Sequence, residues 1–163
     1  MKIIKNIPNL DDNSICRLFV NAQRLLNKDK NNTDAIKVLE AIKTEWERRL
    51  ELFQSGNYKA ASPEHGVLSV VGYRVGNEGE NQQFRRQVLD YIMSNILPPI
   101  SSPAYMAEWG VELSYTRYRK LRRVIQVLAS RGQTMGNMNK AVSEWKSDLI
   151  YLENIWWSKI TTN

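Results

Sequence analysis

The sequence predicts an all-α protein in which an N-terminal helical hairpin packs with a C-terminal four-helix unit. Apolar residues recur at helical spacing, three and four residues apart, through most of the 163-residue chain. Glycine or proline stands where these repeats stop, and good N-cap residues precede several of them. A chain of this length forms one domain with a sizeable core, so we expect one compact body.

The N-terminal hairpin is predicted to span residues 1–56. Helical spacing runs through residues 14–27, stops at the polar stretch KDKNN, and resumes over residues 34–54. Gly56 follows, and glycine is common just past the end of a helix. Two helices joined by a short polar link indicate an antiparallel hairpin.

Residues 57–80 change in character and are predicted to form an ordered connector. The stretch contains five glycines or prolines together with an apolar cluster from Val67 to Val71. A wholly flexible linker would not carry such a cluster. His65 also lies here, where we expect a solvent-exposed or loop-capping role.

The C-terminal unit is predicted to span residues 81–163. Pro98 and Pro99 stop one helix, and Ser102 followed by Pro103 is a good start for the next. Gly110 is expected to end that short helix in a left-handed conformation. The four expected helices cover residues 81–97, 103–109, 114–131 and 139–160.

Positive charge is concentrated between Glu112 and Glu144. This window holds no acidic residue and seven of the 23 basic ones, so the remaining 16 basic residues stand against 17 acidic residues elsewhere. The net charge of +6 therefore comes from this stretch alone. Concentrated positive charge attracts polyanions, which indicates where an anionic partner would bind.

Residues 102–131 have the order helix, four-residue turn with glycine, helix, which is the outline of a helix-turn-helix. The second helix of such motifs enters the major groove of DNA. Arginine suits both phosphate oxygens and guanine edges because its planar fork bonds in a bidentate manner. The candidate nucleic-acid-binding residues are Tyr115, Thr116, Arg117, Arg119, Lys120, Arg122, Arg123 and Gln126.

This pattern predicts a non-enzymatic nucleic-acid-binding protein, or the binding subunit of a DNA- or RNA-processing assembly, with DNA ahead of RNA. The alternative is a protein–protein adaptor or inhibitor that docks its basic face on an acidic partner. A third class is a small enzyme built on carboxylates such as Glu144 and Asp148, one helical turn apart. Two acids at that spacing more often form a solvated face.

The last helix suggests a second surface. Trp145, Leu149, Leu152 and Trp156 form one apolar stripe that we expect to be buried. Trp157, near Ile150, lies about 100° away from this stripe. We expect Ile150 and Trp157 either to meet the N-terminal hairpin or to form an interface, including one between copies of the chain.

Composition excludes several other classes. With one cysteine, Cys16, and one histidine, the chain lacks ligands for a His/Cys zinc site, so no metal is expected. Neither a GxxxxGK[ST] nor a GxGxxG phosphate motif is present, and no cofactor is expected. The lone cysteine favours a reducing compartment, hence a cytoplasmic location, and no apolar run is long enough to span a membrane.

The runs GYRVG, LPPISSPAYMAEWG and AVSEWKSDLIYL, with the basic helix between the last two, cover roughly residues 64–153. This combination resembles a family of small uncharacterised bacterial proteins. The resemblance implies a bacterial or phage source and a fixed place for the SPAYMAEWG helix. It implies no activity, cofactor or binding residue.

Overall fold

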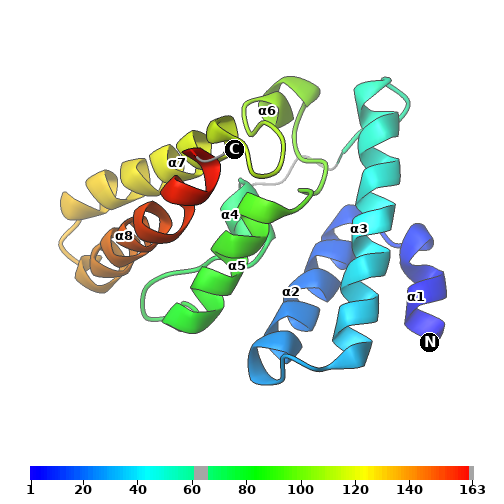
Figure 1. The fold of residues 1–163 in the computed structure, drawn as a ribbon, viewed down its shortest axis with the longest axis horizontal. Helices are drawn as coiled ribbons and strands as arrows, with labels where there is room; N and C mark the ends of the chain where they lie inside the picture. Colours follow the sequence, from blue (N-terminus) through cyan, green and yellow to red (C-terminus); the bar gives the residue numbers. More distant parts are fainter. Residues whose placement is uncertain (61–65, 162–163) are drawn as a thin grey trace. The chain divides into compact units, whose positions relative to one another are not determined.

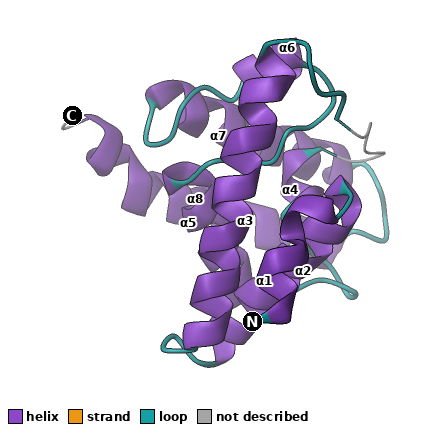
Figure 2. Ribbon diagram, turned by 90° about the vertical axis from the view of Figure 1, so that its right-hand side faces the viewer, coloured by secondary structure: helices purple, strands orange, loops and turns teal. Residues whose placement is uncertain are grey.

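The computed structural model describes residues 1–60 and 66–161, and the secondary structure of this part of the chain is entirely helical (Figure 2). His65 lies outside the described residues. The fold class is therefore all-α, as predicted. The elements are α1 (Lys2–Asn6), the 3-10 helix η1 (Ile7–Asn9), α2 (Asp12–Lys28), α3 (Thr33–Gln54), α4 (Val67–Val70), α5 (Gln82–Ser94), α6 (Pro103–Ala107), α7 (Tyr115–Gln133) and α8 (Asn139–Thr161).

The contacts within the chain divide it into two compact units, each of which is described by itself. Unit 1 contains residues 1–72 and 96–106, and unit 2 contains residues 73–95 and 107–163. The predicted boundaries at 56 and 80 are therefore not the observed ones. The described residues of the expected connector contribute α4 to unit 1 and residues 73–80 to unit 2.

The predicted helical hairpin is present in unit 1, where α2 and α3 lie side by side (Figure 1). Asp11 and Asn32 cap the two helices by accepting hydrogen bonds from backbone N–H groups. Phe19 and Trp46 pack across the hairpin with ring centroids 5.0 Å apart. Leu25 was expected in the apolar stripe, but it is exposed.

A buried ion pair joins the N-terminal residues to α3. Arg49 pairs with Glu45 at 2.6 Å and with Asp12 at 2.7 Å, and it also donates to the carbonyl oxygen of Leu10 at 2.6 Å. The Tyr58 hydroxyl donates to Asp12 at 2.6 Å. Burial and the Asp12 hydrogen bond raise the pKa of Tyr58 to about 12. This network fixes the start of α2 against α3.

Unit 2 is built on a second hairpin, formed by α7 and α8, with α5 packed against α8 (Figure 1). Gly132 lets the helices approach closely near their turn, since a Cβ there would lie 2.8 Å from Val142 and 3.0 Å from Trp145. Trp145, Leu152 and Trp156 are buried, as the apolar stripe predicted. No described helix has the length and apolar character needed to cross a bilayer.

Asp148 is fully buried in unit 2, contrary to the solvated face expected for this residue and Glu144. It accepts hydrogen bonds from Arg85 Nε at 2.8 Å and from the Tyr73 hydroxyl at 2.7 Å. Glu144 accepts from the backbone N–H of Gly76 at 2.9 Å and lies 3.6 Å from Arg85. These contacts attach the segment that follows Tyr73 to α5 and α8.

Candidate nucleic-acid interface

The basic helix α7 begins with a local cap. The Ser114 hydroxyl accepts from the Arg117 backbone N–H at 3.0 Å and donates to the Val111 carbonyl at 2.7 Å. Gly110 has φ +61°, so the predicted left-handed conformation is confirmed. A Cβ at Gly110 would lie 2.8 Å from Thr116 Cβ, which places the turn directly against the first turn of α7.

Arg117 is the main correction to the predicted site, because it is buried and cannot contact phosphates. Its guanidinium donates to four backbone carbonyl oxygens at 2.5–2.9 Å, those of Ile92, Asn95, Trp109 and Gly110. Burial lowers the pKa of Arg117 to about 10, which still leaves it charged near neutral pH. Its role is to hold the end of α5 and the 109–110 turn against the start of α7.

Lys120 is also engaged within the protein. Its ammonium pairs with Glu108 and lies 5.9 Å from the centroid of the Trp109 ring. Two of the predicted basic contacts, Arg117 and Lys120, are therefore committed to intramolecular partners. The remaining predicted residues on α7 are exposed: Tyr115, Thr116, Arg119, Arg122, Arg123 and Gln126.

A groove brings most of these exposed residues together with the end of α8. It has a volume of about 500 Å³ and lies wholly within unit 2. We call it the α7–α8 groove; its lining residues are Tyr115, Tyr118, Arg119, Arg122, Arg123, Gln126, Glu153 and Trp157. Thr116 is the exposed candidate that does not line it.

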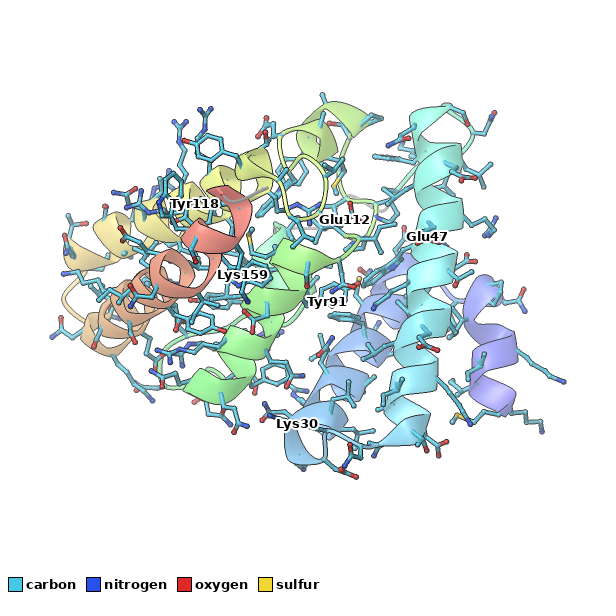
Figure 3. The ribbon with its side chains drawn as sticks, viewed as in Figure 1. Lys30, Glu47, Tyr91, Glu112, Tyr118 and Lys159 are labelled. Carbon is cyan, nitrogen blue, oxygen red and sulfur yellow. The ribbon has the colours of Figure 1, made fainter. Side chains whose placement is uncertain are left out.

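Three aromatic side chains form one wall of this groove. Trp157 packs edge-on to Tyr115 with centroids 6.1 Å apart, and at a tilt to Tyr118 with centroids 5.6 Å apart. Figure 3 labels Tyr118 on α7, next to the last turns of α8. Tyr118 is buried, whereas Tyr115 is 54% and Trp157 45% exposed. Two aromatic rings are therefore accessible from the groove.

A hydrogen-bond cluster on the other side of α8 fixes its last turns. The Trp156 indole N–H donates to Asp90 Oδ1 of α5 at 2.8 Å. The Tyr151 hydroxyl donates to the same carboxylate at 2.8 Å. Because Trp156 is held on α5, its neighbour Trp157 is directed towards α7.

The groove has a positive rim and one carboxylate. In the described part of the chain, no acidic group lies within ion-pair distance of Arg119, Arg122 or Arg123. Glu153 faces the same space from α8. Burial raises the pKa of the Tyr118 phenol, although the charge of Arg122 opposes this shift. Because the net change is upward, the phenol is neutral at physiological pH.

Tyr118 and Glu153 line the groove but were not among the predicted binding residues. Tyr118 is buried on α7. Trp157 was expected to meet the N-terminal hairpin or to form an interface; it lies against Tyr115 and Tyr118 of its own unit, and its role in an interface stays a prediction. Ile150 is 61% exposed and does not line the groove.

The order helix, turn, helix that outlines a helix-turn-helix is present, with α6 and α7 on either side of the Gly110 turn. Helix α6 has five residues, and none of them is buried. Its first four residues belong to unit 1, whereas α7 belongs to unit 2. A DNA-binding helix-turn-helix needs its first helix packed on the second, and the groove-reading geometry stays a prediction.

The described residues contain no group of three or more histidine, cysteine or acidic side chains placed to hold a metal ion. Cys16 lies in α2, and burial raises the pKa of its thiol to about 12. A thiol with this pKa is almost entirely protonated at neutral pH, and a protonated thiol is a poor nucleophile.

Gly110→Val should lower the free energy of unfolding by about 1–3 kcal/mol, since a bulky residue is forced into a left-handed conformation. The new side chain would also collide with Thr116 at the start of α7. Gly136→Val is the matched control, because a Cβ at Gly136 meets nothing within 4 Å. Equal losses for the two variants in urea denaturation would contradict the structural role of the Gly110 turn.

No protein-family model, curated protein or solved structure matches the chain. The resemblance to small bacterial proteins therefore stays an expectation from the sequence. The geometry of the α7–α8 groove is therefore the basis for a function.

Proposed function

We propose that the protein is a non-enzymatic nucleic-acid-binding protein, or the binding subunit of a DNA- or RNA-processing assembly, and that the α7–α8 groove is its binding surface. The observation that carries this proposal is the joint presence of three arginines and two accessible aromatic rings in one groove. Arginines attract and orient phosphates, and aromatic rings stack on bases.

The charge distribution supports a polyanionic partner at this face. Arg122 and Arg123 lie three and four residues after Arg119, so all three project from neighbouring turns on one side of α7. Because Arg117 and Lys120 bind partners within the protein, these three arginines are the expected phosphate contacts. An acidic protein partner would satisfy the same charges but would make less use of the aromatic rings.

The binding constant should fall with salt in proportion to three phosphate contacts. At about −0.7 per contact for single strands and −0.9 for duplex DNA, the log–log slope is expected to lie between about −2 and −3. Raising salt from 50 to 200 mM should then weaken binding roughly 20- to 40-fold. Fluorescence anisotropy with labelled DNA and RNA oligonucleotides measures this slope.

Replacing Arg119, Arg122 and Arg123 together by alanine should bring the slope close to zero. The matched control replaces Arg131 and Lys140, which are exposed basic residues of the same window outside the groove. Absence of binding to any nucleic acid at low salt would refute the proposal. Equally tight binding of polyglutamate would favour the acidic-partner alternative instead.

A further inference from the structure

We infer that the α7–α8 groove takes unpaired bases of a single strand, stacked on Trp157, rather than duplex nucleic acid; this rests on the function proposed above. Stacking needs a base whose face is accessible, and the faces of paired bases inside a duplex are covered by their neighbours. The accessible rings of Trp157 and Tyr115 offer such a platform beside the arginine rim.

The dimensions of the groove support this occupant. Its volume of about 500 Å³ suits one or two nucleotides and is far smaller than a duplex. Its polar residues Arg119 and Gln126 come from α7, while Glu153 and Trp157 come from α8. The groove is thus a recess between two helices, whereas a duplex reader presents a single projecting helix.

Glu153 also favours a single strand, rather than a duplex, as the ligand of the groove. A carboxylate inside a basic groove opposes a ligand that presents phosphate alone. It accepts hydrogen bonds well from the amino groups of bases, as acidic side chains do from cytosine N4. In a duplex one hydrogen of this amino group is already paired, whereas an unpaired base offers both hydrogens and its ring donors to the carboxylate. A ligand with both a phosphate and an exposed base edge satisfies Arg119 and Glu153 together.

The chain provides its own optical probe for this contact. Four of the five tryptophans, Trp46, Trp109, Trp145 and Trp156, are at most 6% exposed, whereas Trp157 is 45% exposed. Stacking of a base on Trp157 should therefore quench the accessible part of the intrinsic fluorescence. The four buried tryptophans supply a constant background.

The experiment titrates the full chain with single-stranded and duplex oligonucleotides of equal length, at fixed low salt, and follows tryptophan fluorescence and anisotropy. We expect single strands to bind at least about 10-fold more tightly and to quench the fluorescence. Trp157→Ala should weaken single-strand binding by roughly 10-fold or more, as loss of a stacking platform does. Trp157→Phe should retain most of the affinity but lose the quenching.

Ile155→Ala is the matched control, since Ile155 is an exposed apolar residue of the same helix outside the groove. Its binding curve should coincide with that of the unsubstituted chain. Equal affinity for duplex and single strands, with no effect of Trp157→Ala, would overturn the inference and leave the proposed function standing. Absence of binding to either would remove both.

Discussion

Asp148→Ala is expected to lower the free energy of unfolding by about 3–5 kcal/mol, because it removes the buried carboxylate that lies nearest to the Arg85 guanidinium. Arg85 is 2% exposed and directs Nε at the Asp148 carboxylate, and the buried Tyr73 hydroxyl donates to the same oxygen. Removing the carboxylate leaves both donors away from water. Urea denaturation followed by circular dichroism measures the loss.

Two further variants separate the charge from the cavity that alanine creates. Asp148→Asn keeps the shape and one acceptor oxygen, so its loss should be smaller than that of alanine. Glu153→Ala removes an exposed carboxylate from the same helix and should change stability by no more than about 0.5 kcal/mol. A loss below about 1 kcal/mol for Asp148→Ala would contradict a structural role of the buried pair.

Arg117→Ala is expected to lower the free energy of unfolding by about 2–4 kcal/mol. The alanine variant leaves four carbonyl oxygens without their donor, and each buried unsatisfied group costs about 1–3 kcal/mol. Water can reach part of the exposed turn and will offset some of this loss. Hydrogen exchange should show faster opening at the end of α5 and at the start of α7.

Arg119→Ala is the matched control, since it removes an exposed arginine from the same helix, two residues away. Its stability should stay within about 0.5 kcal/mol of the unsubstituted chain. Arg119→Ala should weaken nucleic-acid binding, whereas the main effect of Arg117→Ala should be a lower free energy of unfolding. If Arg117→Ala weakened binding and Arg119→Ala lowered stability, the result would show that Arg117 faces the ligand.

Local chemistry made the helices predictable. The last helix was expected over residues 139–160 and spans Asn139–Thr161, and the basic helix was expected over 114–131 and spans Tyr115–Gln133. Apolar spacing and cap residues act over a few positions, so they are visible in one sequence. The two units were not predictable in this way, because the return of residues 96–106 to unit 1 depends on distant contacts.

The error at Arg117 has a traceable cause. Arg117, Leu121, Ile125 and Ala129 recur every four residues, and all four are buried. The spacing therefore placed Arg117 on the buried face, but its charge led to a surface assignment. The carbonyl groups that satisfy it belong to α5 and to the 109–110 turn, whose positions the sequence does not reveal.

The groove could be predicted only in part. Its arginines follow from the basic face of α7, but the position of Trp157 depends on the pairing of α7 with α8. Gly132 lies against Trp145 near the turn. Tyr118 lies 14 residues before Gly132 in α7, and Trp157 lies 12 residues after Trp145 in α8. Since both helices rise about 1.5 Å per residue, these similar lengths of helix bring Tyr118 beside Trp157. The close approach at Gly132 is one of the contacts that fix this register.

The carbonyl contacts of Arg117 also bear on how the chain can be shortened. One guanidinium binds the oxygens of Asn95 and Trp109, so the chain returns to nearly the same point after the intervening excursion of residues 96–106 into unit 1. A short turn joining residue 95 to residue 107 would bypass that excursion. A miniature protein made of unit 2 alone, residues 73–95 joined in this way to residues 107–163, would retain α5, α7 and α8. It would also retain every residue that lines the groove.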